Sequence, residues 1–228
     1  MKNIIIAIDG HSGCGKSSTA KAAAKILGLK YIDSGATYRA ATLYFMRNAV
    51  DINDQTAVKE ALKRIQIDIS FNPETGKYET WLNGENVEND IRGMEVTGKV
   101  SEVSAIPEVR AAMTAEQRRM AEGSGVIMDG RDIGTAVFPY ADLKIFMTAD
   151  VNIRAERRVK ELVENNMPAD FETVRENLLK RDRIDSGRSV NPLRRAEDAI
   201  DIDTTNLTFD KQVAVVVELA REKMNSRN

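Results

Sequence analysis

A short apolar run leads directly into a glycine-rich loop near the start of the chain. Residues 4–19 read IIIAIDGHSGCGKSST, in which Gly10, Gly15, Lys16 and Ser17 fit the pattern glycine, any four residues, glycine, lysine, then serine or threonine. Glycines let successive backbone N–H groups turn inward, and the start of the next helix adds partial positive charge. The pattern predicts a phosphate-binding loop between a strand and a helix, which commits the chain to an α/β fold.

The residues on either side of the loop agree with this interpretation. Ile4–Ile8 is typical of a buried parallel strand, and Ser18–Leu27 is alanine-rich with the apolar spacing of a helix. Lys16 would contact the β- and γ-phosphates as a point charge, and the Ser17 hydroxyl would bind the Mg²⁺ that they share. The alternative is a strand-to-helix turn without a ligand. The residues expected to hold the nucleotide donor are Gly10, His11, Ser12, Gly13, Cys14, Gly15, Lys16, Ser17 and Ser18.

Composition limits the remaining classes of function. The 228 residues suffice for one core with an inserted lobe, and the formal net charge of −2 argues against a surface devoted to nucleic acid. The single histidine and single cysteine make neither a metal ligand set nor an intramolecular disulfide. The first apolar run is about five residues long, whereas a membrane helix needs about 20. We therefore expect a cytoplasmic protein that spans no membrane and binds no nucleic acid.

The order of the elements predicts two kinds of sheet. Strand patterns alternate with helical ones, as in a parallel sheet covered by helices on both faces. Residues 67–87 differ, because IDISF and YETWL are joined and followed by the turn residues NPETGK and NGE. We expect a small antiparallel lobe there. Residues 95–122 have helical spacing, and Pro107 marks the start of a new helix. Further strands are expected at 125–128 and 143–148, before a long helical region.

Arginines gather in the last third of the chain. For residues 154–160 a solvated helix face is the usual explanation. Residues 181–188, RDRIDSGR, mix arginines with Asp, Ser and Gly, which predicts a flexible cationic lid. The planar fork of arginine suits neutralisation of a passing phosphoryl group, and a closing segment would exclude water.

Three aspartates are candidates for a role near the metal. Asp129 ends the strand Val126–Asp129, where a second strand of such folds places a carboxylate near Mg²⁺ or its water shell. Asp132 follows three residues later, and Asp9 directly precedes the loop. Spacing alone does not rank them, and Asp9 could equally brace the loop.

Motifs along the whole chain resemble those of the bacterial cytidylate kinases, a family of P-loop nucleoside monophosphate kinases. The matching segments are IDGHSGCGKSST, DSGATYRA from Asp33, the pair Ile91–Arg92, IPEVR around Arg110, DGRDIGTAVFP from Asp129, and RDRIDSGR from Arg181. A phosphate loop is common to many unrelated proteins, whereas the DSG and DGRD segments together are close to diagnostic. Many relatives carry proline in place of His11 and a small residue in place of Cys14, and a backbone cradle requires neither side chain.

The resemblance implies transfer of the γ-phosphoryl group of ATP, with Mg²⁺, to CMP and dCMP by a monomer in pyrimidine nucleotide metabolism. It also implies a core domain of residues 1–35 and 123–228, with a short helical lid at roughly 153–190. Residues 36–122 would form an inserted monophosphate-binding domain whose antiparallel sheet lies at about 67–87. A kinase for another small molecule, a nucleotide-dependent switch and a nucleic-acid binder are the alternatives.

The resemblance also assigns individual roles. The catalytic residues would be Lys16, Arg131, Arg181 and Arg188; Ser17 and Asp129 would bind the metal; Ser34 and Asp185 would hold the pentose; Ser101, Arg110 and Asp132 would read cytosine; and Arg39 would join the arginines on the phosphates. An arginine with a carboxylate or hydroxyl matches the acceptors and the amine of the cytosine edge. An exposed Ser101, surface ion pairs at Arg39 and Arg110, and packing roles for Tyr38 and Trp81 are the structural alternatives. The strand-like segment Asp201–Leu207 is a candidate wall for adenine.

Overall fold

The computed structural model describes residues 4–164 and 167–226. Internal contacts divide the chain into two compact units, Met1–Tyr31 with Gly123–Asn228, and Ile32–Glu122. We call the first the core unit and the second the inserted unit. The domain bounds that the sequence suggests stay a prediction.

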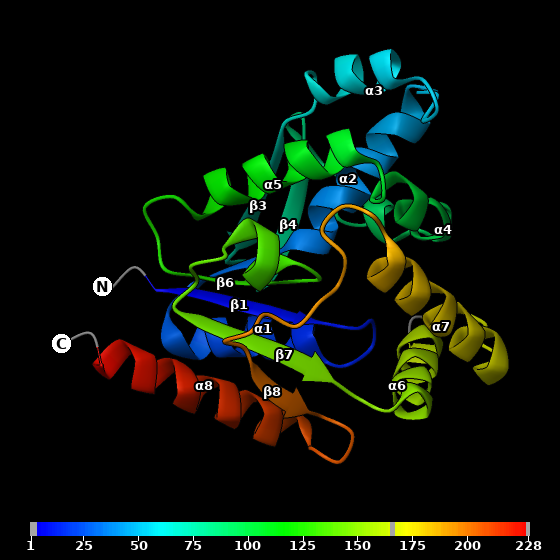
Figure 1. Ribbon diagram of the computed structural model, residues 1–228. Coiled ribbons are helices and arrows are strands. Elements are labelled where there is room, and N and C mark those ends of the chain that lie inside the picture. Colours follow the sequence, from blue (N-terminus) through cyan, green and yellow to red (C-terminus); the bar gives the residue numbers. More distant parts are fainter. Residues whose placement is uncertain (1–3, 165–166, 227–228) are drawn as a thin grey trace. The chain divides into compact units, whose positions relative to one another are not determined.

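A five-stranded sheet organises the core unit among the described residues, in the order β2-β6-β1-β7-β8. Its strands are β1 (Ile5–Gly10), β2 (Lys30–Asp33), β6 (Val126–Gly130), β7 (Leu143–Thr148) and β8 (Ile200–Asp203). The division between the units falls within β2. Strand β1 pairs in parallel with β6 and β7, and β7 pairs in parallel with β8 (Figure 1). The buried, apolar character of β1 and β6 suits strands at the centre of such a sheet.

Helices complete the core unit. They are α1 (Lys16–Leu27), α6 (Val151–Glu164), α7 (Phe171–Gly187), α8 (Phe209–Asn225) and the short π-helical segment η2 (Ile133–Val137). Helix α1 packs against α8 and the strands, and η2 packs against β1 and β6. No helix in the described ranges is long and apolar enough to cross a membrane. The predicted α/β class is confirmed.

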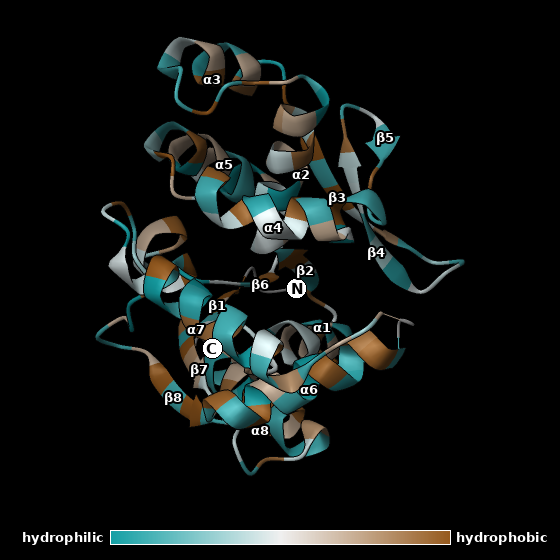
Figure 2. Cartoon of the chain, turned by 90° about the vertical axis from the view of Figure 1, so that its right-hand side faces the viewer, coloured by the Kyte–Doolittle hydropathy of each residue, from teal (hydrophilic) through white to brown (hydrophobic). Residues whose placement is uncertain are grey.

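Helices α6 and α7 pack on each other through a small apolar cluster. Ala155 of α6 and Val174 and Leu178 of α7 are buried there, with Val159 and Leu162 packed against them. Both helices carry apolar and polar residues along their length (Figure 2). Helix α7 continues to Gly187, so residues 181–187 of the predicted cationic lid are helical. The mobility of this segment stays a prediction. The arginines of that segment are carried on a helix, which fixes their spacing.

The inserted unit combines helices with the second sheet. Its elements are α2 (Ser34–Arg47), α3 (Gln55–Leu62), β3 (Ile67–Asn72), β4 (Lys77–Leu82), β5 (Glu85–Asn86), η1 (Asp90–Arg92), α4 (Met94–Val103) and α5 (Pro107–Ala121). Strands β3, β4 and β5 form an antiparallel sheet in this order, with Ile67 opposite Leu82. The expected antiparallel sheet is therefore confirmed. Pro107 begins α5, as its position in the sequence predicts.

Candidate active site

The glycine-rich loop joins the carboxyl end of β1 to α1, and close packing around it requires glycine. A Cβ atom on Gly10 would lie 2.1 Å from the Met147 carbonyl oxygen. Gly15 has a φ of +91°, and a Cβ there would lie 2.7 Å from Gln212 Oε1. Because no side chains fill the loop at these positions, its backbone N–H groups are free to face an oxyanion.

Lys16 begins α1 and is only 6% exposed. Its Nζ atom donates to the His11 carbonyl oxygen at 3.2 Å, so the side chain folds back across the loop. Burial, and next the positive charge of Arg131, lower the pKa of Lys16. A bound polyphosphate would offset both effects, because its negative charge favours the ammonium form.

Ser17 and Asp129 meet beside the loop. Ser17 Oγ donates to Asp129 Oδ2 at 2.6 Å, and the Tyr31 hydroxyl donates to Asp129 Oδ1 at 2.8 Å. A hydroxyl and a carboxylate are hard oxygen donors of the kind that Mg²⁺ accepts together with phosphate oxygens and water. The described residues hold no group of three or more His, Cys, Asp or Glu side chains suited to bind a metal by themselves. The pair therefore fits a metal that arrives with a nucleotide.

Asp9 braces the chain rather than facing the loop. Its Oδ1 and Oδ2 atoms accept the backbone N–H groups of Ile133 and Gly134 at 2.8 Å and 2.7 Å. Burial is the main cause that raises the pKa of Asp9 to about 7, against the two hydrogen bonds, which lower it. Asp9 thus fixes the start of η2, directly after Arg131 and Asp132. The sequence left open that Asp9 braces the phosphate loop, whereas its hydrogen bonds are to η2.

The expected catalytic arginines and two aspartates form one cluster in the core unit. Arg131 Nε donates to Asp185 Oδ2 at 2.7 Å, and Arg188 lies 3.7 Å from Asp185 Oδ1 and 3.5 Å from Asp132 Oδ1. Burial alone would raise the pKa of Asp185, but Arg131, Arg188 and Arg181 outweigh it and lower the pKa. These side chains come from the link between β6 and η2 and from the C-terminal end of α7 and the residue after it, so these sequence-predicted residues are brought together here.

Two core-unit residues to which the sequence assigned no role in the site contact the loop. They are Arg154 and Asp182. Arg154, in the first turn of α6, is 5% exposed and donates to the Ser12 carbonyl oxygen at 3.1 Å. It also pairs with Asp182 of α7 at 2.8 Å. The solvated helix face expected for residues 154–160 is therefore wrong for Arg154. The burial of Arg154 could not be predicted from the sequence, because charge and helical spacing alone do not reveal burial.

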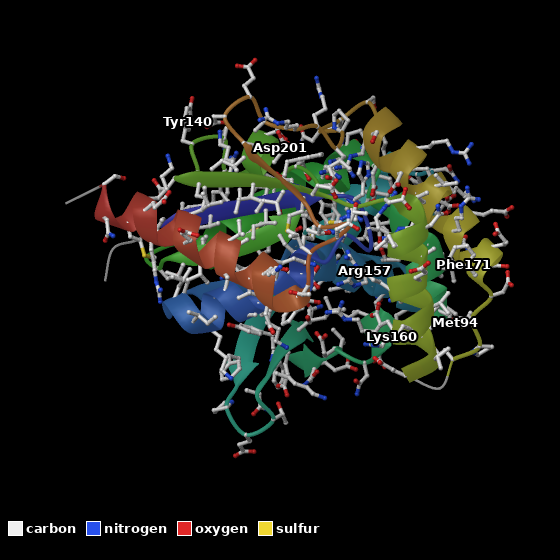
Figure 3. The ribbon with its side chains drawn as sticks, turned by 90° about the horizontal axis from the view of Figure 1, so that it is seen from below. Met94, Tyr140, Arg157, Lys160, Phe171 and Asp201 are labelled. Atoms are coloured by element: carbon white, nitrogen blue, oxygen red, sulfur yellow. The ribbon has the colours of Figure 1, made fainter. Side chains whose placement is uncertain are left out.

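The segment after β8 also reaches the loop. Thr204 Oγ1 donates to the Cys14 carbonyl oxygen at 2.8 Å. Arg157, which is labelled in Figure 3, donates to the Thr204 carbonyl oxygen at 2.7 Å. The Cys14 side chain is fully buried. The thiol of Cys14 is therefore not exposed at the surface of the loop.

In the inserted unit, Asp33 holds two arginines. It pairs with Arg39 at 2.7 Å and with Arg92 at 3.1 Å, and it caps α2 by accepting the Ala36 N–H. Burial opposes the charge on Asp33, but Arg39 and Arg92 overcome this effect and lower the pKa to about 2. Arg39 is therefore held by a carboxylate that also pairs with Arg92. Neither the N-cap role of Asp33 nor its two arginine partners was predicted from the sequence.

Arg110 lies in the interior of the inserted unit. It is 1% exposed, donates to the Ser104 carbonyl oxygen at 3.0 Å and lies over the Tyr38 ring at 5.2 Å. A surface ion pair at Arg110 is thus excluded. Ser101 is half-buried in α4, and its carbonyl oxygen accepts the Ser104 hydroxyl. Tyr38 packs as a cation–π partner, which agrees with a packing role.

Ser34 begins α2 and is almost fully buried. Gln117 of α5 donates to Thr37 Oγ1 at 2.8 Å and reaches the Ser34 carbonyl oxygen at 3.5 Å. These contacts tie the first turn of α2 to α5. Gln117 is a further residue that sequence reasoning missed, since glutamine at one position of a helix carries no motif.

Comparison with known proteins agrees with these features. The family model described as cytidylate kinase matches residues 6–222. A curated cytidylate kinase of Cytophaga hutchinsonii is 52% identical over 224 residues, which cover 98% of this chain and 96% of that protein. One from Bacteroides thetaiotaomicron is 52% identical over 215 residues, covering 93% and 94%. An uncharacterized protein from Eubacterium ventriosum has a similar fold, with a TM-score of 0.51 at 13% identity over 95% of this chain and 97% of that one.

Proposed function

This chain belongs to the cytidylate kinase family, and from that premise we propose a chemical role for each part of its site. It is a nucleoside monophosphate kinase that uses ATP and phosphorylates CMP and dCMP. The observation that supports this activity most directly is the glycine cradle with Lys16 folded across it, beside the cluster of Arg131, Arg188, Asp132 and Asp185.

The loop would bind the triphosphate of ATP. Backbone N–H groups of residues 10–18 would surround its phosphates, and Lys16 would leave the His11 carbonyl oxygen to contact the β- and γ-phosphates. Ser17 and Asp129 would hold Mg²⁺, which neutralises phosphate charge when it is bound. Tyr31 supports this role, because its hydrogen bond orients Asp129.

The acceptor nucleotide would be held by its phosphate, sugar and base. Arg39, Arg131, Arg181 and Arg188 would bind the acceptor phosphate or the transferring group, and Ser34 and Asp185 would bind the pentose. Arg110, Asp132 and Ser101 would read cytosine. The burial of Arg110 and Asp132 supports base reading, since hydrogen bonds to buried groups discriminate strongly. Uracil would present a carbonyl where cytosine presents an amine, a mismatch that costs on the order of 1–3 kcal/mol.

The reaction follows from these roles as a direct in-line transfer. An oxygen of the CMP phosphate attacks the γ-phosphorus of ATP, a new O–P bond forms, and the bond to the leaving ADP oxygen breaks. The acceptor oxygen is already anionic at neutral pH, so no general base is required. Catalysis then depends on orientation and on neutralisation of charge by Lys16 and the arginines. A monomeric state and a cytoplasmic location stay predictions, which gel filtration and cell fractionation would test.

A substrate panel tests the proposal. ADP formation from MgATP would be measured with CMP, dCMP, UMP, AMP, GMP and no acceptor, under identical conditions. We expect strong preference for CMP and dCMP and little turnover without an acceptor. Equal turnover without acceptor would indicate a nucleotide switch or an ATPase, and preference for another acceptor would indicate a different kinase. Either result would refute the roles given to Arg110, Asp132 and Ser101.

A further inference from the structure

Arg154 connects three parts of the core unit through its guanidinium group. Nε donates to the Ala149 carbonyl oxygen at 3.1 Å, just before α6 begins. One terminal nitrogen donates to the Ser12 carbonyl oxygen at 3.1 Å, and the other lies 2.8 Å from Asp182 Oδ2. Each nitrogen therefore has its own partner, and only the rigid fork of arginine fits all three at once.

Asp182 carries the connection to α7. Its Oδ2 atom faces Arg154, and its Oδ1 atom lies 3.2 Å from His11 Nδ1. Burial would raise the pKa of Asp182, but His11 and Arg154 together outweigh this and lower it. The carboxylate thus contacts the loop directly at His11 and indirectly, through Arg154, at Ser12.

Gly13, the next residue of the loop, also packs against Arg154. A Cβ atom on Gly13 would lie 3.1 Å from Arg154 Cβ and 3.2 Å from its carbonyl oxygen, so the loop backbone packs directly on the start of α6. Residues 11, 12 and 13 are therefore all fixed by α6 and α7. The apolar cluster between these helices makes them one support for the loop.

Asp182 also has a special place on α7. It follows Arg181 and precedes Asp185 by three residues, so all three lie within one turn of the helix. The contact of Asp182 with the loop therefore sets how far along its axis, and at what rotation, α7 presents Arg181 and Asp185.

We propose that Arg154 and Asp182 are positioning residues that hold helix α7 in register with the phosphate loop. They act on phosphoryl transfer through the loop backbone and through Arg181, without touching a substrate. This inference rests on the proposed function. It predicts that loss of the pair displaces both the backbone donors and the arginine that stabilise the transferring group. Small displacements of this kind lower turnover on the order of 100-fold.

The test compares two matched changes in the core unit. Asp182→Asn keeps the shape of the side chain and removes its charge. Asp198→Asn is the control, because Asp198 likewise pairs with a buried cation, Lys144, at 2.9 Å and plays no part in the site. For Asp182→Asn we expect kcat to fall on the order of 100-fold, with far smaller changes in the KM for either substrate. For Asp198→Asn we expect kcat to stay at the wild-type value.

A second readout does not depend on turnover. Hydrogen exchange of residues 10–17 in the nucleotide-free protein should be faster in Asp182→Asn than in wild type, and unchanged in Asp198→Asn. Arg154→Lys provides a second variant if Asp182→Asn does not fold, since lysine keeps the charge and loses the fork. The double variant of Asp182→Asn and Arg154→Lys should be little slower than the worse single variant, because both changes break the contact that the two residues share.

The outcomes separate this inference from the proposed function. A wild-type kcat in Asp182→Asn, even with a lower melting temperature, would reduce the pair to a structural role and overturn the proposal. Unchanged exchange of the loop would overturn it too. A wild-type protein that fails to phosphorylate CMP would refute the proposed function, while the exchange experiment would still decide whether Asp182 holds the loop.

Discussion

Two buried carboxylates, Asp9 of the core unit and Asp33 of the inserted unit, have different partners. In the core unit, Asp9 accepts only the backbone N–H groups of Ile133 and Gly134, and its pKa is raised to about 7. In the inserted unit, Asp33 pairs with Arg39 and Arg92, and its pKa is lowered to about 2. Burial disfavours the charged form in both, so the difference comes from the arginines. Asp9 therefore fixes backbone, whereas Asp33 orients cations, as Asp185 does in the core unit.

This difference extends to the two sets of proposed binding groups. The phosphate cradle consists of backbone N–H groups, and its shape depends on close approaches at Gly10 and Gly15. The candidate groups in the inserted unit are side chains, Arg39 and Arg110, each held by one or two neighbours. Substitutions in the cradle should therefore act mainly on the transition state, whereas those of Arg39 and Arg110 should act mainly on substrate binding.

The largest effect is expected for Lys16→Ala. Removal of this charge should lower kcat by at least about 100-fold, because developing charge on the transferring group loses its neutralising partner. Lys25→Ala, at an exposed position of the same helix, is the matched control and should keep wild-type turnover.

Arg39→Ala tests the same comparison in the inserted unit, since we expect it to raise the KM for CMP more than it lowers kcat. Wild-type turnover in a folded Lys16→Ala would refute the role of Lys16. Equal effects of Lys16→Ala and Arg39→Ala on kcat would contradict the expected difference between the cradle, which acts on the transition state, and Arg39, which acts on substrate binding.

The pKa of Asp9 predicts how stability depends on pH. The unfolded carboxyl loses its proton near pH 4 and the folded one near pH 7, so between these values the folded state binds more protons. Stability from this group should therefore fall by a few kcal/mol as pH rises from 4 to 7 and then level off. Denaturant unfolding of wild type and Asp9→Asn across this range would measure the difference. A constant gap between the two proteins would show that Asp9 does not titrate in this window.

Gly10→Ala tests the backbone cradle by sterics alone. The added Cβ would lie 2.1 Å from the Met147 carbonyl oxygen, so the loop or β7 must shift. We expect a loss of about 2–3 kcal/mol in the free energy of unfolding. Gly98→Ala in α4 is the control, because nothing lies within 4 Å of its added Cβ and alanine favours a helix. Thermal melts of both variants would show whether the two glycines differ. Similar melting temperatures would mean that the loop tolerates the methyl group.

The sequence predicted those features of the fold and the site that depend on residues close together in the chain. A glycine loop with Lys16 and Ser17, and the start of α5 at Pro107, depend on residues that are adjacent in the chain. Family resemblance added Arg131, Arg188 and Asp185, which the structure brings into one cluster. The roles of Arg154 and Asp182 could not be predicted, because they depend on contacts between residues 28 to 171 positions apart in the chain. The pairing of Asp33 with Arg92 was not predicted for the same reason.

The smallest effect is expected at Asp33, and its sign is opposite to that at Asp9. Because the pKa of folded Asp33 is depressed to about 2, its stabilising contribution is complete above pH 4 and is lost as pH falls toward 2. At pH 6, Asp33→Asn should lose on the order of 2 kcal/mol, and the gap to wild type should shrink at pH 3. Asp54→Asn, which alters the N-cap of α3 in the same unit, controls for loss of a helix cap. If the gap for Asp33→Asn does not shrink at pH 3, the pairing with Arg39 and Arg92 adds nothing to stability, and the contrast between Asp33 and Asp9 does not hold.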